Sequence, residues 1–230
     1  MVKRVSKNLL GLALIPFCLG YLWQLFSMIF SITYKAHAPY YFAGGAIAYV
    51  VVHVLFNKPI LTYVFGHELT HAFFAMLFGG ALKSFHASDK GGRVTITKSN
   101  FIITLAPYFF PLYTFCILVL YYIARASSAG NATINALIFF SGVSFTFHLI
   151  LTLIFLQTDQ NDIREEGAVF SYPLIFLFNI LFTAFLINVY MADHEDYLRF
   201  LVGGIIKSTN VVAYLLSIVY GLIQKAWERG

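Results

Sequence analysis

The stretch "PILTYVFGHELTHAFFAMLFGG", residues 59–80, combines a helical pattern with ionisable side chains in an otherwise apolar run. Proline suits the first turn of a helix and a glycine pair typically follows its end, so the stretch predicts a helix from about Pro59 to Phe78. Ionisable side chains are costly inside a membrane, where they usually mark a functional site. The stretch therefore suggests both that the chain lies in a membrane and that this helix carries a functional site.

The composition of the whole chain is that of an integral membrane protein. Of its 230 residues, 60% are hydrophobic and 11% are charged, whereas soluble domains carry roughly 25% charged residues. The net charge of +5 is spread over the termini and short loops. This pattern argues against a nucleic-acid partner and for charge that orients the chain in a lipid bilayer. Cys18 and Cys116 both lie in apolar runs and indicate neither a disulfide framework nor a thiolate metal site.

The apolar runs predict an all-α membrane protein, a polytopic bundle of about six or seven transmembrane helices in one domain over residues 1–230. The first run, from about Leu9 to Ile32, exceeds the ~7–15 apolar residues of a secretory signal and matches the ~20 of a membrane span. The last run, residues 201–223, has polar residues near its start, and the sequence leaves open whether it spans the membrane or lies at the interface. Further apolar runs are residues 41–56, 101–124, 132–156 and 168–190.

Residues 81–100, "ALKSFHASDKGGRVTITKSN", form the sizeable polar stretch between the apolar runs. Within it, "RVTIT" alternates and is β-branched, and "SDKGG" supplies turn residues. The stretch predicts a short β-hairpin at the membrane surface, with its backbone buried in protein or in contact with water.

His67, Glu68 and His71 form an HExxH pattern, which indicates a zinc site. Positions i and i+4 lie on one face of a helix, so both imidazoles can reach one ion. Glu68 lies about 100° around the helix from His67, where it can take a proton from a water molecule and pass it to a leaving amine. The alternative is a pair of core histidines bonded to neighbouring helices. Three ionisable residues in one apolar stretch disfavour that alternative.

A catalytic zinc site needs a third protein ligand, and the cluster "QTDQNDIREEG", residues 157–167, offers the strongest acidic donors. Asp159 and Asp162 are three positions apart and would share a face on a continued helix. One of them could bind the metal while the other orients a histidine. The residues alone leave the choice open.

These segments together resemble the site-2 protease family of intramembrane zinc metalloproteases, particularly its compact, M50B-like members. The matching stretches are "YVFGHELTHAFFAMLFGG", "KSFHASDKGGRVTITKSN", "LAPYFFPLY" and "QTDQNDIREEGAVFS". The resemblance implies that His67 and His71 bind Zn²⁺, that Glu68 is the general base and that an aspartate from a later helix is the third ligand. The Gln-x-Asp-Ile context favours Asp162, with Asp159 as the alternative.

The resemblance further implies that the substrate is a membrane protein cut in or near a transmembrane segment, and that an edge strand pairs with this substrate in an extended form. Val94 and Ile96 are the candidate positions on that strand, and a hairpin with a purely structural role is the equal alternative. The family's usual Asp-Gly pair and Asn-x-x-Pro element are missing from this sequence. His148 is a candidate for the substrate-holding group, but a packed, hydrogen-bonded histidine is the favoured interpretation of this residue. In this interpretation residues 42–190 are the metalloprotease core, the hairpin is cytoplasmic, and the protein lies in the cell (inner or cytoplasmic) membrane. The alternatives are a catalytically silent zinc-binding regulator or scaffold, and a proton or metal transporter.

Overall fold

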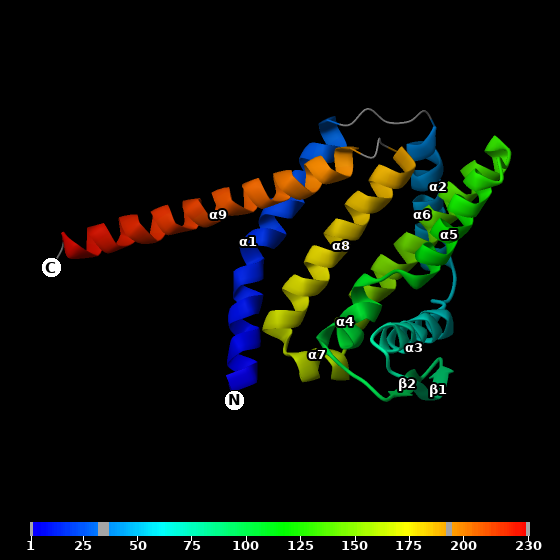
Figure 1. Cartoon of the computed structure of the whole chain (residues 1–230), viewed down its shortest axis with the longest axis horizontal. Helices are drawn as coiled ribbons and strands as arrows, with labels where there is room; N and C mark the ends of the chain where they lie inside the picture. Colours follow the sequence, from blue (N-terminus) through cyan, green and yellow to red (C-terminus); the bar gives the residue numbers. More distant parts are fainter. Residues whose placement is uncertain (1, 32–36, 192–194, 229–230) are drawn as a thin grey trace. The chain divides into compact units, whose positions relative to one another are not determined.

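The computed structural model describes residues 2–31, 37–191 and 195–228, and most of these residues are helical (Figure 1). In chain order the elements are α1 (Val2–Ser31), α2 (Ala38–Leu55), α3 (Ile60–Leu77), β1 (Leu82–Ser88), β2 (Gly91–Ile96), α4 (Phe101–Phe109), α5 (Leu112–Ala126), α6 (Asn131–Phe155), α7 (Asn161–Glu166), α8 (Ala168–Met191) and α9 (Glu195–Trp227). The predicted all-α fold with one small antiparallel hairpin is confirmed.

Among the described residues, five helices are long and apolar enough to cross a membrane: α1, α2, α6, α8 and α9. A sixth crossing results if the bent pair α4 and α5 counts as one span. The chain is thus a multi-pass membrane protein. Six spans, the number reached when the bent pair is included, is the lower of the six or seven spans predicted from the sequence. The C-terminal run 201–223 lies within α9, which is long and apolar enough to be a candidate span. α3, with its three ionisable residues, is not among the candidate spans of the described residues.

One compact unit joins Met1–Thr33 to Val169–Gly230 and contains α1, α9 and nearly all of α8. Its core consists of buried side chains from all three helices: Tyr21, Met28, Ile180, Ala184 and Phe200. α1 and α9 approach closely, since a Cβ at Gly20 would lie 2.3 Å from the hydroxyl oxygen of Ser208. Small residues at such crossings are how helices associate in lipid.

The second unit, Tyr34–Ala168, contains α2 to α7 and the hairpin. Its helices α2 and α6 meet at glycines. A Cβ at Gly45 would lie 1.9 Å from the carbonyl oxygen of Phe139, and a Cβ at Gly142 would lie 2.1 Å from the carbonyl oxygen of Phe42. Any side chain at these two glycines would force the helices apart.

The hairpin lies against α3. β1 and β2 pair antiparallel, with Phe85 opposite Val94, and Gly91 opens β2 at a φ of +136°, which glycine adopts without a steric penalty. The ring of Phe85 packs edge to face on Phe65 of α3, with 5.4 Å between the ring centroids. The hairpin predicted within residues 81–100 is therefore present and is anchored to the helix that carries the HExxH motif.

The apolar run 101–124 is broken into two helices, α4 and α5, which meet at an angle of 74°. Phe110 precedes Pro111, and the residue before a proline is driven toward extended backbone, here φ −102° and ψ 103°. The side chain of Asn100 caps the start of α4 by accepting hydrogen bonds from the backbone N–H groups of Ile102 and Ile103. α4 is consequently a short, separately capped helix, and it contacts both α3 and α7.

Candidate metal centre

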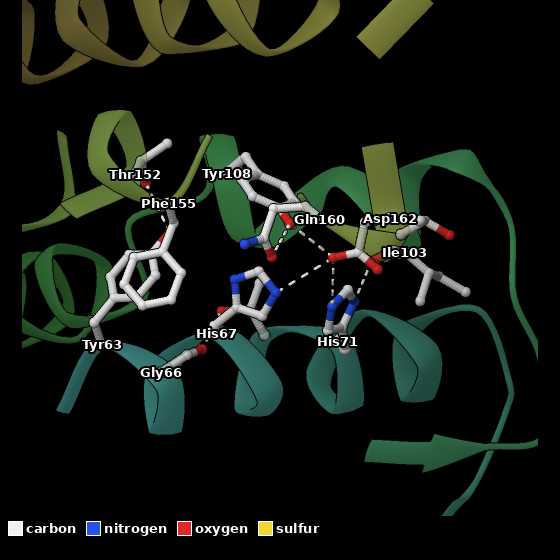
Figure 2. Close-up of polar contacts among 12 residues, drawn as sticks. Tyr63, Gly66, His67, His71, Ile103, Tyr108, Thr152, Phe155, Gln160 and Asp162 are labelled. Carbon is white, nitrogen blue, oxygen red and sulfur yellow. Dashed lines mark hydrogen bonds and ion pairs between the residues drawn. The ribbon is translucent and has the colours of Figure 1, made fainter. Parts of the chain in front are cut away.

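α3 presents His67 and His71 on one face, one helical turn apart (Figure 2). Their rings meet edge to face, with 4.9 Å between the centroids. The Nδ1 atom of His71 lies 2.8 Å from the backbone carbonyl oxygen of Ile103 in α4. Because a carbonyl oxygen can only accept, Nδ1 carries the proton and the lone pair of Nε2 is available for a metal ion.

Asp162, in the first turn of α7, completes a cluster with the two histidines. Its Oδ2 atom lies 3.3 Å from His67 Nε2 and 3.4 Å from His71 Nε2. One ligand atom from each of the three residues lies within 4.8 Å of the other two. Ligand atoms about 2.0–2.1 Å from a tetrahedral zinc ion lie about 3.3 Å from one another. The distance from Asp162 Oδ2 to each Nε2 atom is therefore the distance expected between two ligands of one zinc ion.

The electrostatics of the cluster favour a ligating carboxylate. Burial raises the pKa of the Asp162 carboxyl, but its interactions with the imidazoles of His67 and His71 outweigh burial and hold that pKa well below its usual range. Asp162 is therefore ionised, which is the form that binds a metal. Two imidazole nitrogens and one carboxylate oxygen are a donor set found in catalytic zinc sites that keep a fourth position open. The three residues fit a zinc ion.

The structure places the two candidate aspartates differently. Asp159 has a side chain that is 72% exposed and pairs with Arg164 at 3.2 Å, and within the described chain it is not part of the cluster that could hold a metal ion. The helix face that the two aspartates were expected to share is not formed, because α6 ends at Phe155 and α7 begins only at Asn161. Between the two alternatives, the geometry favours Asp162.

Glu68 lies beside the cluster and beneath β2. It is 8% exposed, and a Cβ at Gly92 would lie 2.5 Å from its Oε1 atom. Glu68 and the cluster line a cavity of about 350 Å³ together with Gly92, Val94 and Ile96 of β2. A potential base, a potential metal site and a strand therefore face the same space.

His148, the candidate for the substrate-holding group, is buried in α6. Among the described residues it is not one that lines this cavity. It lines a separate pocket of about 20 Å³ together with His67 and Ser144, which has room for about one water molecule and none for a peptide. The geometry favours a packing role for His148 behind His67.

Tyr108 of α4 is the site residue that the sequence did not reveal. Its side chain is fully buried, and its ring meets His67 edge to face with 5.0 Å between the centroids. Its hydroxyl donates a hydrogen bond of 2.9 Å to Asp162 Oδ2 (Figure 2). In the apolar stretch "LAPYFFPLY", residues 105–113, no local signal distinguishes this tyrosine from a core aromatic.

A known family shares the segment that carries most of this site. The family model described as Peptidase M50B-like matches residues 41–161. The match covers slightly more than half of the chain, includes the HExxH motif and the hairpin, and ends one residue before Asp162. No curated protein and no solved structure matches the chain.

Proposed function

The chain belongs to the Peptidase M50B-like family, and we propose that it is a membrane-embedded zinc metalloprotease that hydrolyses a peptide bond in or near a transmembrane segment of a membrane protein. One observation carries the proposal: Asp162 Oδ2 lies 3.3 and 3.4 Å from the Nε2 atoms of His67 and His71. The buried Glu68 stands beside this cluster and lines the same cavity.

In this proposal His67, His71 and Asp162 hold the zinc ion. Bound there, the ion supplies a Lewis acid and lowers the pKa of water. Glu68 accepts a proton from the attacking water at a carboxylate oxygen and delivers it to the nitrogen of the leaving amine. Water is thereby added across the amide bond, which yields one carboxylic acid and one amine. The cover of β2 over Glu68 keeps this carboxylate directed at the cavity.

β2 provides a wall along which an extended substrate segment can lie. Val94 and Ile96 line the cavity, and β1 occupies only one edge of β2 in the two-stranded sheet of the described residues. A strand added along the other edge would gain backbone hydrogen bonds and would present a peptide bond that a helix hides. This arrangement supports Val94 and Ile96 as substrate-binding positions and a membrane protein as the partner.

The apolar helices support a multi-pass protein in a lipid bilayer. We place it in the cell (inner or cytoplasmic) membrane, with the hairpin and the metal site on the cytoplasmic side. Reaction of a membrane-impermeant label with a cysteine introduced at the exposed Lys90, between the two strands, tests the orientation. Labelling of intact cells from the outside would contradict it.

The function is tested by comparing the wild-type protein with Glu68→Gln, which keeps the shape of the side chain but cannot accept the proton. Both are expressed in the same host, and new protein amino termini in the isolated membranes are labelled chemically and identified by mass spectrometry. We expect termini within or beside transmembrane segments with the wild type alone, while each purified protein contains about one zinc ion per chain. Glu228→Gln, at an exposed position after α9, is the control.

Three other results of this experiment would contradict parts of the proposal. Termini that appear equally with Glu68→Gln would refute the role of Glu68. Zinc in both proteins without any new terminus would favour the silent regulator or scaffold. A wild-type protein that binds no zinc would refute the metal site itself.

A further inference from the structure

The backbone does not hold the three ligand positions equally firmly. His67 and His71 lie on α3, a helix of 18 residues, whereas Asp162 lies on α7, a helix of six residues. Isolated helices shorter than about 12–15 residues are marginal in water. Within the described chain, the N-cap residue of α7, Gln160, makes no side-chain capping hydrogen bond. Asp162 therefore depends on support from outside its own helix.

Tyr108 is in the position to give this support (Figure 2). α4 contacts both α3 and α7, so the tyrosine reaches the ligands of both helices. Its ring packs on His67, and its hydroxyl donates to Asp162 Oδ2 at 2.9 Å and lies 3.3 Å from Gln160 Oε1. Gln160 in turn donates to the hydroxyl of Thr158. One phenol thus connects α4 to the third ligand and to the segment that leads into α7.

The hydrogen bond from Tyr108 is compatible with a metal on the same carboxylate. An ionised carboxylate offers about four lone-pair sites, about two on each oxygen, so Asp162 Oδ2 can accept from the phenol with one and still direct the other toward an ion between the two histidines. Hydrogen bonds to an ionised acceptor are roughly twice as strong as those between neutral groups. Groups that hydrogen-bond a metal ligand typically change metal affinity or activity about 10–100-fold when they are removed.

We propose that Tyr108 is a positioning residue that holds Asp162 Oδ2 toward His67 and His71 and thereby sets the affinity of the site for zinc. The inference rests on the metal site of the proposed function but requires nothing of its proteolytic activity. Metal binding is therefore the measurement that tests it.

The experiment removes one hydroxyl group and keeps the ring. Tyr63→Phe is the control for Tyr108→Phe, because Tyr63 is also buried and its ring also lies against His67, with 5.9 Å between the centroids, but its hydroxyl pairs with Thr152. Zinc affinity is measured on the purified full-length proteins in detergent by competition with a chromophoric chelator. We expect Tyr108→Phe to weaken zinc binding about 10–100-fold, and Tyr63→Phe to weaken it less than about twofold.

Two further measurements separate positioning from a general effect on the fold. Cobalt(II) bound in place of zinc has visible absorption bands that report ligand geometry, and these bands should change in Tyr108→Phe but not in Tyr63→Phe. The metal-free variants should unfold within about 4 °C of each other.

Four results would overturn the inference alone. They are an unchanged zinc affinity of Tyr108→Phe, unchanged cobalt bands, an equal loss of affinity in both variants, and a much lower unfolding temperature of metal-free Tyr108→Phe. A wild-type protein without zinc would overturn the proposed function and this inference together. Zinc binding without proteolysis would overturn only the proposed activity.

Discussion

Replacement of Gly92 by alanine is expected to disable the base while sparing the metal ligands. The added Cβ would lie 2.5 Å from both Cγ and Oε1 of Glu68 and 2.7 Å from a methyl carbon of Val64. Carbon atoms pack at about 3.5–4.0 Å, so an overlap of roughly 1 Å has to be relieved. Because Glu68 and β2 are in direct contact, either the carboxylate moves or the strand lifts from α3.

The size of the effect follows from this displacement. A misplacement of about 1 Å can reduce the rate about 10²-fold, which corresponds to about 2.7 kcal/mol of activation free energy. The overpacking also lowers the free energy of unfolding by about 1–3 kcal/mol. The three atoms nearest to the new Cβ belong to Glu68 and Val64 and not to a ligand, so the zinc content should stay at the wild-type level.

The assay follows the membrane substrate that amino-terminal labelling identifies. Initial rates of formation of its new terminus are measured with purified protein at several substrate concentrations, and kcat is expected to fall about 100-fold. Gly44→Ala is the control, because its Cβ meets only ring carbons of Phe139 at an ordinary 3.8 Å. The reasoning is refuted if Gly92→Ala retains more than about a third of the wild-type kcat, or if both variants lose activity equally. Loss of zinc from Gly92→Ala would likewise refute it.

Two further predictions concern the third ligand and the helix packing. Asp162→Ala should lose the zinc ion, because a catalytic site needs three protein ligands. Asp159 lines the cavity but pairs with Arg164 and lies outside the cluster, so Asp159→Ala should keep the ion; the opposite pattern in metal analysis would reverse the assignment. Gly142→Ala places a Cβ 2.1 Å from the carbonyl oxygen of Phe42 and should lower the free energy of unfolding by about 1–3 kcal/mol. Thermal unfolding in detergent measures this loss, and equal unfolding temperatures for Gly142→Ala and Gly44→Ala would contradict the described packing.

The helix that carries the site could be predicted from the sequence because its signals are local. A proline before the apolar run and a glycine pair after it mark the two ends, and α3 extends from Ile60 to Leu77 as these signals indicate. The spacing of His67 and His71 places them on one face of any α-helix. The hairpin was predictable for the same reason, since alternation and turn residues act over a few positions.

The third ligand could not be decided from the sequence, because the decision depends on where a helix begins. The chain leaves α6 after Phe155 and resumes a helix only at Asn161, so that Asp159 is left exposed while Asp162 turns toward the histidines. The position of Tyr108 beside Asp162 could not be predicted from the sequence for a related reason. Only the break that separates α4 from α5 shows which aromatic of the apolar run meets a ligand.

The division of the chain into two units also fixes the order in which they can be completed during translation. The unit with the metal site is continuous, Tyr34–Ala168, whereas the other joins residues from both sides of it. When Ala168 has been synthesised, every ligand position exists, but the partners of α1 in α8 and α9 do not. At about 5–20 residues per second, synthesis of the segment Val169–Gly230 of that unit takes several seconds. The candidate metal site can therefore form while residues of the other unit are still being synthesised.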